Sequence, residues 1–261
     1  MTQPLSNVRV LDLTRLLPGG YCTQLLADMG ADVIKIEEPG RGDYIRWSPP
    51  MVGEYSAAHW VLNRNKRSVT LNLKQPEGKD LFLKLCETAS VVVEGFRPGV
   101  MDRLGLGYEA VRSRNPRIVY CSISGYGQSG PYATKAGHDI NYIGYAGLLG
   151  FTGTPEGRPV LPGVQIGDLG GGGLLPAVGI LAGLIKAQAT GEGEYVDIAM
   201  MDGVVSWLTI HAGKFFGGGG EPTWGSEVLN GAVPCYNLYR CADGKWITVG
   251  ALEPQFWKAF C

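Results

Sequence analysis

The chain has 261 residues, 45% of them hydrophobic and 18% charged, which is enough apolar material for a globular protein with a sizeable core. Its 23 lysines and arginines nearly balance its 24 aspartates and glutamates, and this argues against a nucleic-acid-binding protein because no basic surface dominates. Glycine is the outlier, because 40 of the 261 residues are glycine, about twice the usual share of about 7%. This excess, without a collagen-like period, indicates tight turns and close backbone approaches.

The first elements in chain order predict a βαβ unit. A strand is expected at 8–13, a helix follows through Met29 until Gly30 ends it, and a second strand is expected at 33–36. Further on, helices are predicted to open at 76, to cover 108–114 and to run from about 174 to 189. Strands are predicted at 91–94, 118–123 and 194–200. This alternation predicts an α/β fold with a doubly wound, Rossmann-like parallel sheet.

The composition changes after Trp207. A run of four glycines at 217–220 predicts a linker, and an Asp-Gly turn then predicts a hairpin of 236–241 with 246–249. We therefore expect a large α/β domain over 1–205, a linker over 206–228 and the start of a smaller α+β domain over 229–261. A helical pattern opens near Glu253 and breaks off at Cys261, which indicates a truncated chain.

The apolar run Leu174–Ile185 is shorter than the about 20 residues of a spanning helix, so no membrane span is expected. The first residues lack the pattern of a signal peptide. Six scattered cysteines form no Cys-x-x-Cys pair and no metal-ligand spacing, which predicts reduced thiols and no metal. Together these features predict a cytoplasmic protein, with the peroxisome and the mitochondrion left open.

Several common catalytic motifs are missing from the sequence. No Gly-x-Gly-x-x-Gly follows the first strand, and no Walker motif and no Gly-x-Ser-x-Gly nucleophile elbow occurs anywhere. The doubly wound pattern therefore does not predict a nicotinamide or ATP site, and the chemistry must come from other residues.

His138 and Asp139 form the first acid–base candidate, at the start of a helix rich in glycine and tyrosine. An imidazole beside a carboxylate is suited to act as a general base. The alternative is structural, with Asp139 favouring the helix dipole and His138 packing.

Asp168 is the second candidate, and Leu169 separates it from the glycines 170–173, which we expect to lie directly before the next helix. Capping of that helix by Asp168 would explain the aspartate alone. Four glycines exceed what a cap needs, so we expect their exposed N–H groups to hold an oxyanion.

Glu253 and the basic segment 63–74 are weaker candidates. Glu253 suits the first turn of a helix for dipole reasons alone. The segment 63–74 carries four cations that could bind phosphate or simply form a solvated face. Arg97, near the end of a predicted strand, lies at the sheet edge where open α/β sheets bind ligands.

Seven segments carry a resemblance to a known family and are ordered as in it. They read VRVLDLTRLLPGGYCTQLLADMGADVIKIEEPG, NRNKRSVTLNLKQPEG, VVVEGFRPGVMDRLGLGYE, NPRIVYCSISGYGQSGPY, AGHDINY, GDLGGGGLLPAVGI and YRCADGKWITVGALEPQFW. Together they cover nearly the whole chain. The chain resembles the class III CoA-transferase (CaiB–BaiF) family, most closely its α-methylacyl-CoA racemase branch.

The racemase resemblance implies inversion of the α-carbon of a 2-methylacyl-CoA by two bases through an enolate. It makes His138 and Asp168 the two bases and Glu253 the residue that orients His138. It implies that 1–205 binds the CoA moiety, with no cofactor beyond CoA, no metal and an interlocked homodimer. The implied CoA contacts are Thr70, Leu71, Asn72, Leu73, Arg97, Gly137, Ile140, Asn141 and Tyr142.

The same resemblance keeps a second activity open. In the family's true CoA-transferases an aspartate matching Asp139 is the nucleophile that carries CoA between two acids. One departure from the racemases concerns the CoA site, because Glu38 stands where they commonly carry an arginine. The resemblance leaves Lys35, Arg41 or Lys66 as candidates to replace that arginine.

Overall fold

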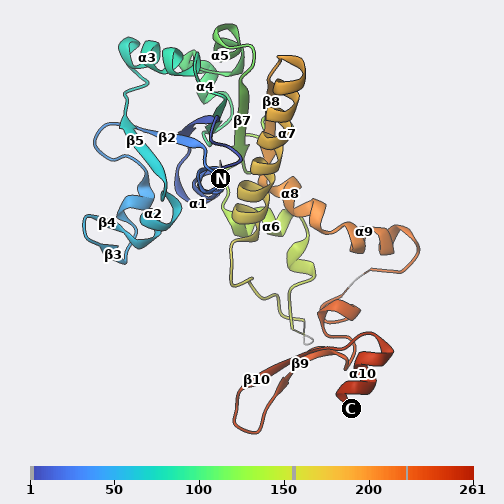
Figure 1. Ribbon diagram of the computed structural model, residues 1–261. Coiled ribbons are helices and arrows are strands. Elements are labelled where there is room, and N and C mark those ends of the chain that lie inside the picture. Colours follow the sequence, from blue (N-terminus) through green and yellow to red (C-terminus); the bar gives the residue numbers. More distant parts are fainter. Residues whose placement is uncertain (1–2, 155–156, 222) are drawn as a thin grey trace. The chain divides into compact units, whose positions relative to one another are not determined.

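Six parallel strands form the central sheet of the computed structural model, which describes residues 3–154, 157–221 and 223–261 (Figure 1). The order is β5-β2-β1-β6-β7-β8. The strands are β1 (Arg9–Leu13), β2 (Asp32–Glu37), β5 (Lys66–Thr70), β6 (Val91–Glu94), β7 (Val119–Ser124) and β8 (Glu194–Ala199). This is the order of a doubly wound Rossmann-like fold, so the predicted fold class is confirmed.

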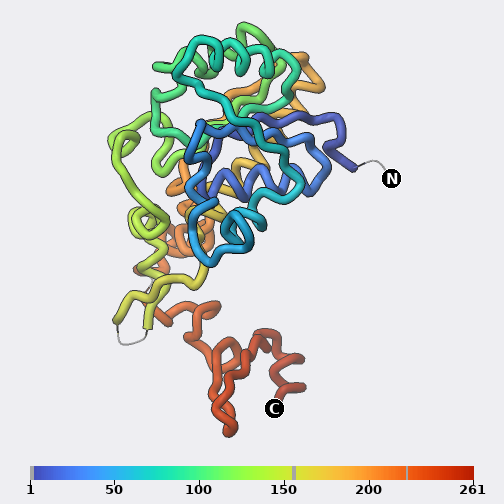
Figure 2. The backbone as a smooth tube through the Cα atoms, turned by 90° about the vertical axis from the view of Figure 1, so that its left-hand side faces the viewer, coloured from blue at the N-terminus to red at the C-terminus, as the bar shows by residue number. Residues whose placement is uncertain are grey.

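Helices cover both faces of the sheet because the strands are apolar on both. Val91 and Val93 belong to the core cluster that includes α1 (Leu16–Asp28) and α7 (Leu175–Thr190). Val92, between them, faces the opposite cluster, against α3 (Pro76–Cys86), α4 (Val100–Leu104) and α5 (Tyr108–Arg114). Both views show α3, α4 and α5 gathered together (Figure 1, Figure 2). The predicted strands and helices are present within about two residues of their expected bounds, except that the helix expected from about 174 begins earlier, at Gly167.

Shorter elements complete the chain. They are the 3-10 helices η1 (Tyr44–Trp47), η2 (Leu148–Gly150) and η4 (Val228–Asn230), the hairpins β3 (Met51–Val52) with β4 (Tyr55–Ser56) and β9 (Tyr236–Arg240) with β10 (Trp246–Gly250), and the helices α2 (Ala57–Leu62), α6 (Asp139–Tyr145), α8 (Met200–Trp207), α9 (Thr209–Phe216) and α10 (Pro254–Phe260). The predicted hairpin and its following helix are among them.

The chain divides into two compact units, 1–142 with 165–204, and 143–164 with 205–261. This differs from the expected domains in two ways. Residues 143–164 group with the C-terminal part, where Phe151 packs on His211 with ring centroids 4.2 Å apart. The expected linker 206–228 contains the helix α9, whose apolar residues were obscured by the glycines that follow it.

The glycines 170–173 are helical, which corrects the expectation that they precede a helix. They lie in the π-helix η3 (Gly167–Leu174), which continues directly into α7. The combined helix, Gly167–Thr190, has 24 residues and by length and composition alone could cross a membrane, so the apolar stretch is longer than expected. Half of its most apolar window is buried in the protein, and α7 packs on β7 and β8. These contacts are those of a core helix.

Candidate active site

Two pockets open at the carboxyl ends of the parallel strands, on either side of the point where the strand order reverses between β1 and β6. Doubly wound folds bind ligands at this point. The first, here called the His138 pocket, measures about 440 Å³ and follows β6, β7 and β8. It is lined by Gly95, Phe96, Arg97, Pro98, Ile123, Ser124, Gly125, Ala133, Lys135, Ala136, Gly137, His138, Asn141, Tyr142 and Met200. The second, here called the Arg15 pocket, measures about 310 Å³ and follows β1, β2 and β5.

The Arg15 pocket shares Phe96 with the His138 pocket. Its lining is Leu13, Arg15, Ile36, Glu37, Glu38, Pro39, Leu71, Asn72, Leu73, Lys74, Phe96, Val100 and Leu104. The CoA contacts implied by the resemblance are therefore divided between the two pockets. Leu71, Asn72 and Leu73 lie in this one, and the His138 pocket holds Arg97, Gly137, Asn141 and Tyr142. Thr70 lines a neighbouring pocket, and Ile140 is half exposed on α6.

Tyr142 fixes the segment that carries His138. Its buried ring lies where a side chain on Gly125 would collide with it, and a Cβ on Gly137 would come within 2.7 Å of it. Its hydroxyl donates to the carbonyl of Gly137 at 2.5 Å. Burial, reinforced by the charge of Asp168, raises the pKa of Tyr142 to about 12, so the hydroxyl keeps its proton. The two glycines thus have a packing reason that a sequence alone does not show.

Asp139 and Asp168 lie next to each other. Asp139 directly follows His138 in the sequence, and Asp168 lies at the start of η3. The backbone N–H of Asp168 donates to Oδ1 of Asp139 at 3.0 Å. Burial and, to a lesser extent, the neighbouring carboxylate of Asp139 raise the pKa of Asp168 and His138 opposes them, which leaves it at about 6. The three predicted residues are therefore close enough to interact. Of the described residues that line the His138 pocket, His138 is the one member of this group.

The expected oxyanion site in the glycines 170–173 is not present as predicted. Their amides fall inside the helix and its own hydrogen-bonding pattern instead of facing outward at its end. Packing explains the glycines, because a Cβ on Gly172 would lie 2.7 Å from Pro18 in α1 and one on Gly171 would collide with the carbonyl of Met200. The glycines let η3 approach α1 and the β8–α8 junction closely.

Glu253 occupies the N-cap position of α10, and its side chain makes no capping hydrogen bond. It belongs to the second unit, whereas His138 belongs to the first. Its expected role in orienting His138 stays a prediction.

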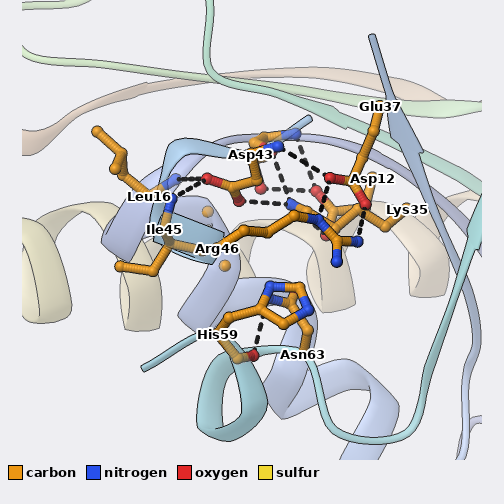
Figure 3. Close-up of polar contacts among 12 residues, drawn as sticks. Asp12, Leu16, Lys35, Glu37, Asp43, Ile45, Arg46, His59 and Asn63 are labelled. Atoms are coloured by element: carbon orange, nitrogen blue, oxygen red, sulfur yellow. Dashed lines mark hydrogen bonds and ion pairs between the residues drawn. The ribbon is translucent and has the colours of Figure 1, made fainter. Parts of the chain in front are cut away.

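A buried cluster of charges lies beneath the turn that follows β1 (Figure 3). Lys35 lies 3.0 Å from Oδ2 of Asp43 and 3.9 Å from Oδ2 of Asp12, and it donates to the carbonyl of Thr14 at 2.8 Å. Lys66 lies 3.3 Å from Asp12. Burial would raise the pKa of Asp12, but the two lysines overcome that effect and lower it to about 2.

This cluster shapes the turn at the Arg15 pocket. Oδ1 of Asp43 accepts hydrogen bonds from the backbone N–H groups of Leu16 at 2.9 Å and Ile45 at 3.0 Å (Figure 3). Leu16 has a left-handed backbone with φ of 60°, a conformation that a branched residue needs such support to keep. The lysines cannot replace a ligand-binding arginine, because the side chains of Lys35 and Lys66 are 2% and 1% exposed and already paired. That expectation is wrong for both.

Glu94, at the end of β6, is a functional candidate that the sequence did not single out. It is buried, and its Oε2 accepts a hydrogen bond from the N–H of Phe96 at 2.7 Å. Burial raises its pKa to about 7 even though Ser122 and Phe96 donate to it. The segment shared by the two pockets is therefore anchored on a carboxyl that titrates near neutral pH.

Known proteins match this chain along nearly all of its length. The model of CoA-transferase family III matches residues 5–261. Succinyl-CoA:glutarate CoA-transferase of Homo sapiens is 41% identical over 99% of this chain and 59% of its own length. Succinate–glutarate CoA-transferase of Agrobacterium fabrum is 46% identical over 97% and 64%. Alpha-methylacyl-CoA racemase of Homo sapiens is 38% identical over 97% and 63%.

Solved structures agree with these matches. A CAIB/BAIF family protein from Brucella suis superimposes with a TM-score of 0.86 at 35% identity, covering 94% of this chain and 65% of that one. The chain spans about three fifths of the length of the curated relatives named above. A family model that matches from residue 5 to the end, together with a matching fold at this identity, leads to one conclusion. The chain belongs to CoA-transferase family III.

Proposed function

We propose that this chain forms the CoA-thioester-binding part of an enzyme that inverts the α-carbon of a 2-methylacyl-CoA by proton transfer. One observation carries the proposal, namely that the backbone N–H of Asp168 donates at 3.0 Å to Asp139, the residue next to His138, which brings a carboxyl whose pKa is raised to about 6 to the segment that carries the imidazole. Proton transfer is most efficient between groups whose pKa lies near the working pH. The carboxyl of Asp168, with a pKa of about 6, meets that condition.

In the proposed reaction one of these groups takes the α-hydrogen, and the electron pair of the broken C–H bond moves into the thioester carbonyl as an enolate. The other group then returns a proton to the opposite face of the carbon. Neither step needs a redox change or a covalent enzyme intermediate. The interlocked homodimer, a cofactor requirement limited to CoA, the cytoplasmic location and the orienting role of Glu253 accompany this proposal as predictions.

A second candidate is CoA transfer between carboxylic acids, and the names of the two transferases among the relatives favour it. Asp139 would attack the thioester carbonyl, form a mixed anhydride and release the CoA thiolate. The thiolate would then attack the aspartyl carbonyl, which gives an aspartyl-CoA thioester and frees the first acid. A second acid would take up CoA by the reverse steps. In the structure Oδ1 of Asp139 already accepts the amide of Asp168.

The two candidates are separated by incubating the protein with a 2-methylacyl-CoA in deuterium oxide, with and without a free dicarboxylic acid. We expect deuterium at the α-carbon without any acceptor acid. His138→Ala should slow exchange by about 10²- to 10⁴-fold, the usual contribution of a general base, with CoA binding retained. Since Asp168 acts as a base only when ionised, the exchange that depends on it should rise as pH passes 6.

Asp139→Asn is the matched variant, because an amide oxygen can still accept the N–H of Asp168. Proton transfer predicts that this variant keeps its exchange activity, whereas CoA transfer predicts complete loss. Acyl transfer to the free acid, no exchange without it and hydroxylamine-sensitive labelling of Asp139 would establish the second candidate instead.

A further inference from the structure

The Arg15 pocket contains an arginine whose contacts are arranged for binding an anion. We propose that Arg15 contacts a phosphate of the CoA nucleotide, and that Glu38 is a resident counter-ion that competes with this phosphate. This inference rests on the proposed function, which supplies CoA as the ligand. It assigns the binding of the nucleotide to a residue that neither the sequence motifs nor the buried lysines identified.

Aromatic rings hold the guanidinium of Arg15 in place. Its central carbon lies 5.1 Å from the ring centroid of Tyr44 and 5.6 Å from that of Phe96. Its Nη1 donates to the hydroxyl of Tyr44 at 2.9 Å. Arg15 follows β1 and Phe96 follows β6, so the stacked pair spans the point where the strand order reverses. An arginine held in this way loses little side-chain freedom when a ligand binds.

Glu38 is the partner that a phosphate would have to displace. Its Oε1 lies 3.3 Å from Nη2 of Arg15, and the two side chains are 34% and 29% exposed. A half-exposed ion pair at this distance is weak because water screens it. A phosphate offers two oxygens to the planar fork of an arginine and binds it more strongly than a single distant carboxylate oxygen does.

Besides Arg15 and Glu38, the described lining of the Arg15 pocket carries two charged side chains, Glu37 and Lys74. Glu37 is already engaged, since its carboxylate accepts from Arg46 at 2.5 Å and from Ser68 at 2.7 Å. Among the described residues of the lining, Lys74 is the second cation. Arg41 is exposed and lines the neighbouring pocket with Thr70. The remaining lining is largely apolar.

The test is the dissociation constant of CoA measured by calorimetry on the wild-type protein and three variants. Arg15→Gln should weaken binding at least tenfold, and Arg15→Lys should recover part of the loss because it keeps the charge without the fork. Glu38→Gln should tighten binding several-fold because it removes the competitor. In the Arg15→Gln background the effect of Glu38→Gln should disappear.

Pantetheine, which lacks the nucleotide phosphates, is the ligand control, and its binding should not change in any variant. Arg114→Gln is the matched protein control, because it removes an exposed ion pair with Glu87 at the same 3.3 Å outside both pockets, and it should bind CoA as the wild type does. Normal CoA binding by Arg15→Gln, or weaker binding by Glu38→Gln, would overturn the inference while leaving proton transfer at His138 intact. A wild-type protein that binds CoA no better than pantetheine would overturn this inference alone, and one that binds neither ligand would overturn the proposed function as well.

Discussion

The two halves of the sheet treat buried charge in opposite ways. On the side of β1, β2 and β5 buried carboxyls have cations beside them, and the pKa of Asp12 and that of Glu37 are both lowered to about 2. On the side of β6, β7 and β8 no lysine or arginine among the described residues pairs with Glu94 or Asp168, and the pKa rises to about 7 for Glu94 and about 6 for Asp168.

This difference suggests a division of labour within one fold. Charges that stay fixed over the physiological pH range give a rigid frame, and that frame supports the turn beside the Arg15 pocket. Carboxyls that titrate near neutral pH can exchange protons, and they lie beside the His138 pocket. The strand order places the two kinds of environment next to each other at the reversal point.

The largest effect on stability should come from removing a buried cation on the side of β1, β2 and β5, where the carboxyls are paired. Lys35→Met leaves Asp43 without its nearby ammonium group and removes one of the two cations near Asp12. Removing one partner from a buried ion pair typically costs about 3–5 kcal/mol. Denaturant unfolding at pH 7 should show a loss in this range, and a loss below about 1 kcal/mol would contradict the idea of a charge-paired frame.

A smaller effect on stability, which depends on pH, is expected on the side of β6, β7 and β8. The pKa of Glu94 is about 7 in the folded protein and near 4.5 when unfolded, so its neutral form favours folding. That contribution is complete below about pH 4.5 and is lost as pH rises through 7. Glu94→Gln removes the titration and should therefore gain stability over the wild type, on the order of 3 kcal/mol, between pH 5 and pH 8.

The measurement is the difference in unfolding free energy between Glu94→Gln and the wild type across this pH range. Titrations elsewhere cancel in that difference, and the amide oxygen of glutamine can still accept the N–H of Phe96. A difference that does not change with pH would show that Glu94 titrates as an ordinary surface carboxyl.

The smallest effect should come from the exposed end of β2 and β5. Arg67 pairs there with Asp32, which also binds Arg9, and the side chain of Arg67 is 66% exposed. Exposed pairs contribute at most about 1 kcal/mol. Arg67→Met should therefore lower the unfolding free energy by less than this, and it serves as the matched control for Lys35→Met. Equal losses of unfolding free energy in Lys35→Met and Arg67→Met would show that the buried ion pairs contribute no more to stability than the exposed ones.

Much of the fold could be predicted from the sequence, whereas the catalytic roles of His138, Asp168 and Glu253 stay predictions. Apolar runs such as 91–94, bounded by turn residues, are typical of strands buried on both faces, and those strands form the sheet. The predicted helix start beside His138 is present, and His138 lines a pocket there. A local sequence pattern is enough to determine where such a helix begins. The structure then placed His138, Asp139 and Asp168 close enough to interact.

Other features depend on contacts between distant segments and could not be predicted. The sequence predicts a loop at the glycines 170–173 because glycine has a low helix propensity. In the structure these glycines are helical, and they allow the helix to pack closely against Pro18 and Met200. Lys35 and Lys66 read as ligand candidates because a sequence does not show that they are buried. Arg15 acquires its role only from Tyr44 and Phe96, which the strand order brings beside it.

The hydrogen bond from the Asp168 amide to Asp139 gives the two candidate reactions different physical signatures. The accepting carboxylate places a negative charge at the positive end of the helix that runs from Gly167 to Thr190. Acylation of Asp139 would convert this anion into a neutral ester-like group and weaken the anchoring of that helix. A turnover cycle that passes through such an adduct would loosen the start of this 24-residue helix once per cycle, and amide hydrogen exchange at its first turn would register the change. A cycle of proton shuttling would leave those amides equally protected throughout.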